Sequence, residues 1–203
     1  MQKNINKLNN LLELFYQSYQ EQDKKNIFLQ SLNEDNKKYS WKDLYIKINK
    51  LSEEISKHIK NGDRCLIVSE NRPEWMISDL SIMLSGGITV PAYITYTERD
   101  YEYIIDDCTP TIIILSNKNQ YEKIKNIINK KTFIKKVIIF DKIENLNKEI
   151  YLNISDIFEK KNYEIKNFYD LKVQRKDIAC IIYTSGTQGK PKGVMLSHGG
   201  ILN

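Results

Sequence analysis

Residues 64–93, RCLIVSENRPEWMISDLSIMLSGGITVPAY, pass from one apolar run through a helical segment into a second apolar run. The first run, RCLIVSE, follows a Gly-Asp turn and has the continuous apolar pattern of a buried strand. Pro73 and Glu74 suit the first turn of a helix, and Gly86-Gly87 suits its end. ITVPAY then predicts the next strand. A strand, a helix and a strand in immediate succession indicate a crossover unit of a parallel sheet.

The same alternation continues toward the C-terminus. The predicted elements are helix 98–108, strand 111–116, helix 118–130, strand 135–140 and a last strand over 177–185. Residues 141–177 are less regular, with one predicted helix around 154–161 that is followed by a charged loop. The order of elements predicts an α/β fold, with a mostly parallel sheet that helices cover on both faces.

The N-terminal part of the chain predicts two helices and a pair of short strands. The first helix is amphipathic, with an apolar face formed by Leu8, Leu11, Leu12, Phe15 and Tyr19. Short strands at 26–32 and 37–40 flank the turn NEDN. A second helix is expected over 41–60, because Ser40 is a suitable N-cap and Asn61-Gly62 a suitable end.

The last predicted strand leads into a segment of different composition. Residues 184–193, TSGTQGKPKG, contain three glycines, three hydroxyl side chains and two lysines. Glycines allow close backbone approach, successive N–H groups can form an anion-binding concavity, and lysines can neutralise the charge of a leaving pyrophosphate. A plain hairpin loop is the alternative, but such loops usually have about two to five residues. The segment therefore predicts a phosphate-binding loop between two strands.

Spacing excludes two other nucleotide-binding motifs. A Walker A motif that ends at Gly189-Lys190 would need Gly in place of Thr184 and Ser or Thr in place of Pro191. The dinucleotide motif G-x-G-x-x-G is also absent from the sequence. The segment is therefore a phosphate loop of another kind.

Composition and charge are those of a globular protein. Of the 203 residues, 41% are hydrophobic and 28% charged, and the formal net charge is +5. Lys is mixed with Asp and Glu along the whole chain, whereas nucleic-acid-binding proteins usually concentrate basic residues on one element. We therefore expect a solvated lysine-rich surface and no nucleic-acid partner.

The cysteines predict neither a disulfide framework nor a zinc site. Cys65, Cys108 and Cys180 are far apart, odd in number and flanked by apolar residues. Buried, reduced thiols in a cytoplasmic protein are therefore expected. The N-terminus lacks the apolar stretch of a signal peptide, and polar residues interrupt the apolar region 76–94 too often for a membrane span.

At the loop the sequence resembles the adenylate-forming (AMP-binding) superfamily, and within it the long-chain fatty acyl-CoA synthetases. Residues 183–198, YTSGTQGKPKGVMLSH, are similar to the superfamily's signature Y-T-S-G-T-T-G-x-P-K-G-V. Upstream, GDRCLIVSENRPEW at 62–75 and GGITVPAYITYT at 86–97 resemble the corresponding parts of long-chain fatty acyl-CoA ligases. The resemblance covers nearly the whole chain from about residue 8.

The resemblance implies a two-step ligase reaction. A carboxylate, here a fatty acid, attacks the α-phosphate of Mg²⁺-bound ATP to give an acyl-adenylate and pyrophosphate, and the thiol of coenzyme A then displaces AMP. The residues implied in binding the ATP phosphates are Thr184, Ser185, Gly186, Thr187, Gln188, Gly189 and Lys192. Two alternatives remain: an enzyme that activates an aryl or amino acid, and a non-catalytic nucleotide-binding module.

Gln188 and Gly200 depart from the family pattern, and His198 has two interpretations. Gln188 replaces the usual second Thr and exchanges a hydroxyl for an amide that can still donate hydrogen bonds. Gly200 stands where an Asn often begins the following helix, so the cap of that helix is uncertain. His198 is interpreted either as a substrate-pocket residue or as a hydrogen-bonded structural histidine.

The later motifs of the family have no counterpart in this sequence. They are the acidic segment that binds adenine and Mg²⁺, the segment that holds the ribose, and the C-terminal lid domain with its catalytic Lys. The resemblance therefore predicts that residues 1–203 are the N-terminal part of an AMP-binding domain. We expect no complete catalytic site, most Mg²⁺ ligands outside this chain, and no activity of the 203 residues by themselves. A fatty acyl substrate would be compatible with peripheral contact between the enzyme and a membrane.

Overall fold

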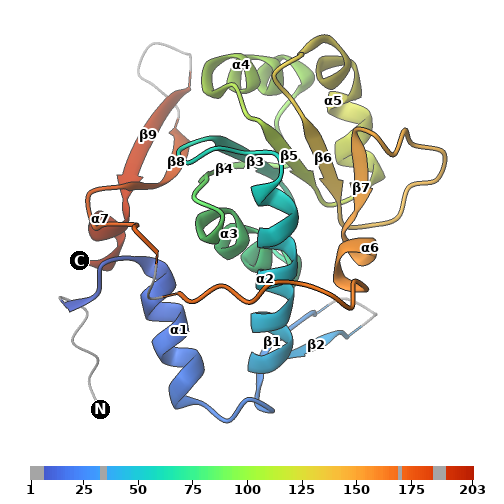
Figure 1. Cartoon of the computed structure of the whole chain (residues 1–203). Helices are drawn as coiled ribbons and strands as arrows, with labels where there is room; N and C mark the ends of the chain where they lie inside the picture. Colours follow the sequence, from blue (N-terminus) through green and yellow to red (C-terminus); the bar gives the residue numbers. More distant parts are fainter. Residues whose placement is uncertain (1–6, 33–35, 169–170, 185–190) are drawn as a thin grey trace.

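The structure is a computed structural model, which describes residues 7–32, 36–168, 171–184 and 191–203. Within these residues the main feature is a seven-stranded sheet with the order β7-β6-β5-β3-β4-β8-β9 (Figure 1). Its strands are β3 (Arg64–Val68), β4 (Ile88–Ala92), β5 (Ile112–Leu115), β6 (Lys136–Ile139), β7 (Tyr151–Asn153), β8 (Ile178–Thr184) and β9 (Lys192–Ser197). Each neighbouring pair is parallel apart from β8 and β9. The predicted α/β class with a mostly parallel sheet is confirmed.

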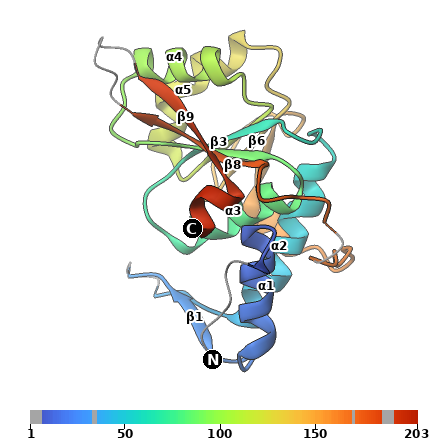
Figure 2. The same ribbon diagram turned by 90° about the vertical axis from the view of Figure 1, so that its left-hand side faces the viewer.

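Helices cover both faces of the sheet (Figures 1 and 2). The helices on one face are α1 (Leu11–Glu21), α2 (Trp41–Ser56), α3 (Pro73–Leu84) and α6 (Ile154–Phe158). They form one hydrophobic cluster with Cys65 and Ile67 of β3. The helices α4 (Glu98–Cys108) and α5 (Lys118–Lys130) form a second cluster with Leu66 and Val68. Successive residues of β3 therefore face opposite layers, as expected for a strand that is buried on both sides.

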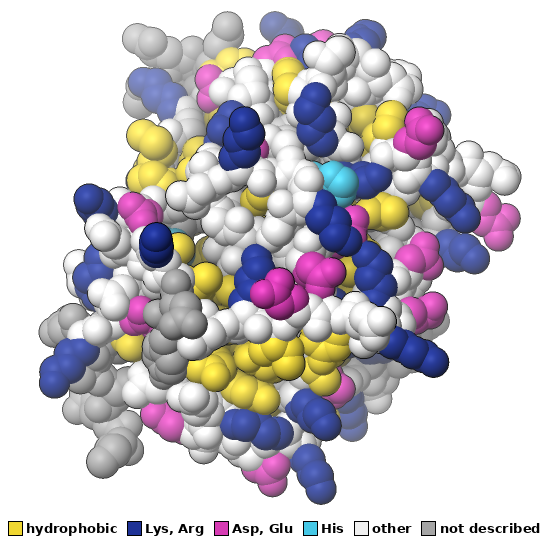
Figure 3. Space-filling view, in the orientation of Figure 1, with side chains coloured by type: hydrophobic (Ala, Val, Ile, Leu, Met, Phe, Trp, Pro, Cys, Tyr) yellow, Lys and Arg dark blue, Asp and Glu magenta, His cyan; other side chains and the backbone are white. Residues whose placement is uncertain are grey.

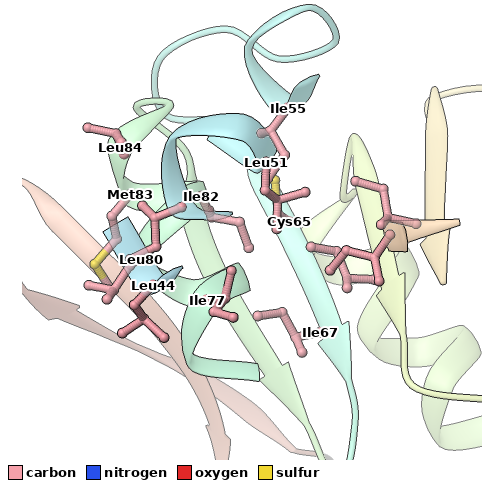
Figure 4. Packing of buried hydrophobic residues seen from close by; sticks show 14 of the residues in the cluster. Leu44, Leu51, Ile55, Cys65, Ile67, Ile77, Leu80, Ile82, Met83 and Leu84 are labelled. Carbon is pink, nitrogen blue, oxygen red and sulfur yellow. The ribbon is translucent and has the colours of Figure 1, made fainter. Parts of the chain in front are cut away.

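The layer of α2 and α3 is the larger hydrophobic core (Figure 4). Leu51 and Ile55 of α2 and Ile77 and Ile82 of α3 pack in the same cluster as Ile67 of β3. All five side chains are fully buried. Since burying a side chain of this size is worth about 1.5–3 kcal/mol, this layer holds the two helices firmly on the sheet.

Short polar motifs fix the helix starts. Ser40 accepts a hydrogen bond from the backbone N–H of Asp43, and the Asp43 carboxylate accepts one from the backbone N–H of Ser40. The predicted N-cap of α2 is therefore confirmed as a capping box. Thr97 and Asp100 form the same box at the start of α4.

Two predicted helix boundaries were wrong. Helix α1 begins at Leu11 and not at Leu8, because Asn10 caps it by accepting a hydrogen bond from a backbone N–H in the first turn. Helix α2 ends at Ser56 and not at residue 60. The N–H groups of Lys57 and His58 bond to carbonyl groups three residues earlier, which tightens the last turn before the chain reaches its expected turn at residues 61–62.

The irregular region 141–177 contains strand β7, which the sequence pattern did not predict, and then the predicted helix α6. The chain after α6 crosses α2 (Figure 1). Lys160 forms an ion pair with Glu54 at 2.6 Å, and the N–H of Lys166 donates to the side-chain oxygen of Asn49 at 2.9 Å. Burial would raise the pKa of Glu54, but hydrogen bonds from Lys160 and a second lysine lower it to about 2.

The remaining elements and the surface agree with the sequence pattern. Strands β1 (Ile27–Gln30) and β2 (Lys38–Ser40) form a separate antiparallel pair, as predicted. On the face shown in Figure 3, Lys and Arg side chains are interspersed with Asp and Glu. Of the helices that the structure describes, none combines the length and the apolar composition needed to cross a bilayer.

The three cysteines are free thiols. Cys65 and Cys108 are buried in the two hydrophobic clusters. Burial raises the pKa of the Cys65 thiol well above its usual range and that of Cys108 to about 12. Since the thiolate is the reactive form, the burial of both residues agrees with the predicted packing role. The prediction of a buried thiol was wrong for Cys180, which is only partly buried.

Candidate functional site

The carboxyl ends of β3, β4 and β8 meet at one edge of the sheet, because the three strands are parallel neighbours. A cleft of about 500 Å³ lies at this edge, between the last residues of β4 and β8, the residues that follow β3 and β4, and Trp75 of α3. Glu70, Tyr93 and Tyr183 form part of its wall. Ligands of α/β proteins usually bind outside the carboxyl ends of the strands, so this cleft is the candidate site.

The antiparallel strands β8 and β9 flank the predicted phosphate loop. In their register Thr184 pairs with Lys192, and Tyr183 pairs with Gly193. Thr184 and Lys192 are both exposed, and they lie next to Tyr183 of the cleft wall. The other predicted phosphate-binding residues lie outside the described part of the chain: Ser185, Gly186, Thr187, Gln188 and Gly189. The structure thus places the first and the last of the predicted residues opposite each other.

Helix α4 contacts both strands at the base of this loop. The hydroxyl of Tyr183 donates a hydrogen bond to Oδ2 of Asp107 at 2.5 Å, and the hydroxyl of Tyr103 donates to the carbonyl oxygen of Pro191 at 3.0 Å. Burial and the hydrogen bond to Asp107 raise the pKa of Tyr183, so its hydroxyl remains a donor at physiological pH. The sequence reasoning missed Tyr103 and Asp107, whose one signal is their spacing of a single turn on the predicted helix 98–108.

The ring of Tyr183 lies against its cross-strand partner, Gly193. A Cβ atom at Gly193 would be 3.3 Å from Cζ of Tyr183 and 2.9 Å from Cγ2 of Ile181. A side chain at this position would force the Ile181 side chain to shift and would press on the Tyr183 ring. Close packing at the base of the loop therefore favours glycine after Lys192.

Glu70 forms a charged part of the cleft wall. The side-chain amides of Asn117 and Gln120 donate to its Oε1 at 3.1 and 3.4 Å. Burial would raise the pKa of Glu70, but the hydrogen-bond donors around it hold the pKa below its usual value. Since β3 and β5 are neighbours and lead to helices on opposite faces, this ionised carboxylate lies at a topological switch point of the sheet.

His198 has a structural position. Its Nδ1 accepts a hydrogen bond from the backbone N–H of Leu11 at 3.4 Å, and its side chain is 3% exposed. Burial lowers the pKa of the ring, so it is neutral near pH 7. Ser197 is the N-cap of α7 (His198–Leu202), because its side chain accepts a hydrogen bond from the N–H of Gly200. The helix is therefore capped although Gly200 replaces the usual Asn. His198 therefore links α1 to α7, in agreement with the structural interpretation.

Asp79 of α3 lies against the β4–β8 pair, beside Thr89 and Cys180, and burial raises its pKa to about 6. The unfolded pKa is about 3.9, so the contribution of Asp79 to stability is greatest below about pH 4 and is lost as the pH rises through 6. We expect Asp79→Asn to raise the free energy of unfolding by about 1–3 kcal/mol at pH 8 and by about half as much at pH 5, which lies between the two pKa values.

Urea unfolding of the 203-residue chain at the two pH values measures this effect. The control is Asp156→Asn, which changes an exposed carboxylate and is expected to alter stability by less than about 0.5 kcal/mol at either pH. Equal effects of Asp79→Asn at pH 5 and pH 8 would show that the Asp79 carboxylate does not carry a charge penalty in the folded state.

Comparison with protein families gives one match over most of the chain. The family described as "AMP-binding enzyme" matches residues 15–203. Among curated proteins, Fatty acyl-CoA synthetase A of Dictyostelium discoideum is 32% identical over 174 residues, which are 81% of this chain and 25% of that protein. Long chain acyl-CoA synthetase 4 of Arabidopsis thaliana is 34% identical over 176 residues, which are 81% of this chain and 26% of that protein.

Solved structures show the same fold. The anthranilate CoA ligase AuaEII in complex with anthranoyl-AMP aligns with a TM-score of 0.78 at 19% identity, over 97% of this chain and 36% of that one. A red-emitting luciferase from Phrixothrix hirtus aligns with a TM-score of 0.73 at 20% identity, over 94% of this chain and 36% of that one. The 203 residues span about a quarter of the length of the two curated relatives.

Proposed function

Because the chain belongs to the AMP-binding enzyme family, we propose that the segment 184–192 holds the phosphates of ATP while a carboxylate is converted to an acyl-adenylate. The observation that carries this proposal is the β8–β9 pair, which places Thr184 opposite Lys192 at the carboxyl edge of the sheet. A hydroxyl can donate to a phosphate oxygen, and an ammonium group can stabilise the charge that develops on pyrophosphate.

The proposed carboxylate is a fatty acid, and coenzyme A is the proposed acceptor of the acyl group. Both parts of the proposal are supported by the names of the two curated relatives, which are acyl-CoA synthetases. The reaction class is then an acid–thiol ligase. The free thiols of the chain fit a reducing compartment, so we propose a cytoplasmic enzyme, for which peripheral contact with a membrane would give access to fatty acids.

Mg²⁺ enters this proposal only as the ion bound to the ATP substrate. Among the residues that the structure describes, no three His, Cys, Asp or Glu side chains gather in a way that could hold a metal ion. Glu70 already accepts hydrogen bonds from two side-chain amides. We therefore assign no metal ligand to the described residues and no step of the reaction to a metal.

ATP–pyrophosphate exchange by the full-length gene product tests the proposed function. Fatty acids of several chain lengths, benzoate and a mixture of amino acids are supplied separately with ATP and Mg²⁺. We expect exchange with fatty acids. Exchange that occurs with benzoate or amino acids and not with fatty acids would contradict the proposed substrate. Binding of ATP without exchange for any acid would contradict adenylation and indicate a non-catalytic nucleotide-binding module.

A further inference from the structure

We infer that Tyr103 and Asp107 of α4 are positioning residues that hold the two ends of the phosphate loop in place. This inference rests on the proposed function and adds two residues that lie outside the loop. Neither side chain is assigned contact with ATP. Each acts on the loop through the residue to which it is hydrogen-bonded.

The two hydrogen bonds act on the two ends of the loop. Asp107 accepts the hydrogen bond of Tyr183, the residue directly before Thr184. Tyr103 donates to the carbonyl of Pro191, the residue directly before Lys192. Tyr103 and Asp107 are one turn apart on α4, so a single helix face holds both ends.

Helix α4 is a rigid support for these contacts. Its first turn is closed by a capping box, and Tyr101, Ile104 and Ile105 on its inner face are fully buried against the sheet. Side chains on a helix that is packed in this way hold a site more accurately than side chains on a loop. The packing of the helix therefore sets the backbone positions of Tyr103 and Asp107.

The loop needs this support because β9 is the last strand of the described sheet. There β9 pairs with β8, and its side chains Val194 and Met195 are 43% and 66% exposed. Pro191 has no backbone N–H, so its carbonyl is the one backbone group that it can offer, and Tyr103 uses that group. The start of β9 is thus held both by its pairing with β8 and by the hydrogen bond from Tyr103 to Pro191.

The chemistry of phosphate binding explains why such support matters. Donors that stabilise developing charge are effective when they are preorganised, because no energy is then lost in reorienting them during the reaction. Small displacements of positioning groups can cause large losses in rate. Loosening either end of the loop should therefore weaken the use of ATP and leave the binding of the carboxylic acid unchanged.

The test uses Tyr103→Phe and Tyr183→Phe in the full-length gene product. Each change removes one hydroxyl and keeps the aromatic ring, so the contact of the Tyr183 ring with Gly193 is retained. In ATP–pyrophosphate exchange we expect each variant to raise the KM for ATP about tenfold, the change that corresponds to about 1.4 kcal/mol. The KM for the carboxylic acid and the melting temperature are expected to stay at the wild-type values.

Two controls separate positioning from general stability. Tyr121→Phe makes the same change on α5, where the ring packs against Tyr151 at 5.5 Å, and is expected to leave the KM for ATP unchanged. Asp107→Asn keeps an oxygen that can accept the hydrogen bond of Tyr183, whereas Asp107→Ala removes it. We expect the asparagine variant to retain most of the wild-type affinity for ATP and the alanine variant to behave like Tyr183→Phe.

Several outcomes would overturn the inference. They are an unchanged KM for ATP in both phenylalanine variants, an equal rise in Tyr121→Phe, and equal values for Asp107→Asn and Asp107→Ala. Failure of the proposed function has a different signature, because Lys192→Ala would then also leave the use of ATP unchanged. If Lys192→Ala impairs exchange and the α4 variants do not, the proposed phosphate-binding role of the loop is retained and the positioning role of Tyr103 and Asp107 is rejected.

Discussion

Replacing Lys192 with alanine is expected to lower kcat/KM for adenylation in the full-length gene product by about 30- to 1,000-fold, or about 2–4 kcal/mol. Lys192 begins β9 opposite Thr184, at the edge of the sheet where β3, β4 and β8 end. Its ammonium group carries a compact positive charge at the base of the loop. A charge of this kind acts most strongly when pyrophosphate departs, so the rate constant should fall more than the affinity for ATP.

The measurement is ATP–pyrophosphate exchange with ATP varied at a saturating concentration of the carboxylic acid. Lys125→Ala is the matched control, because Lys125 is an exposed lysine of α5 that forms an ion pair with Glu122. Removing it should leave exchange at the wild-type rate. If Lys192→Ala is as active as Lys125→Ala, Lys192 is an ordinary surface lysine and the proposed role of the segment 184–192 is wrong.

Much of the fold could be predicted because its information is local. The apolar runs of β3, β5 and β6 are continuous, as required for strands that are covered on both faces. Helix starts depend on hydrogen bonds between residues three positions apart, and Ser40 with Asp43 shows this at α2. Patterns that lie within one element therefore gave the sheet and its helices.

The parts that could not be predicted depend on distant partners. Strand β7 has three residues and obtains its place by pairing with β6, so its own sequence has too little periodicity to be detected. The residues described between α6 and β8 form no regular structure, yet Lys166 and Asn49, 117 positions apart, are joined by a hydrogen bond. Such contacts leave no pattern in the sequence.

The candidate site shows the same difference between local patterns and contacts of distant residues. The segment 184–192 could be proposed as a phosphate loop because its glycines, hydroxyls and lysines are contiguous. The contacts of α4 could not be predicted, because Tyr183 and Asp107 are 76 positions apart and Tyr103 and Pro191 are 88 positions apart. Glu70 was missed for the same reason, since its partners Asn117 and Gln120 follow a different strand. Sequence thus predicted the groups that could meet the ligand, and the structure adds the side chains to which we assign a positioning role.

Replacing Phe168 with alanine is expected to lower the free energy of unfolding by about 3–5 kcal/mol, the usual cost of removing a buried aromatic ring. Phe168 is fully buried, and its ring lies 5.1 Å from Tyr16, 5.5 Å from Tyr45 and 6.0 Å from Phe15. Its ring packs the irregular segment between α6 and β8 against both α1 and α2. Alanine would leave a cavity at the aromatic contact that these three elements share.

Urea unfolding of the 203-residue chain measures the loss, and Ile165→Ala provides the control three residues away. Ile165 is 59% exposed, so its removal should change stability by less than about 0.5 kcal/mol. A loss below about 1 kcal/mol for Phe168→Ala would mean that the segment does not depend on this ring. A loss of the expected size would show that one aromatic residue in an irregular segment stabilises the chain as much as a core residue of a regular helix does.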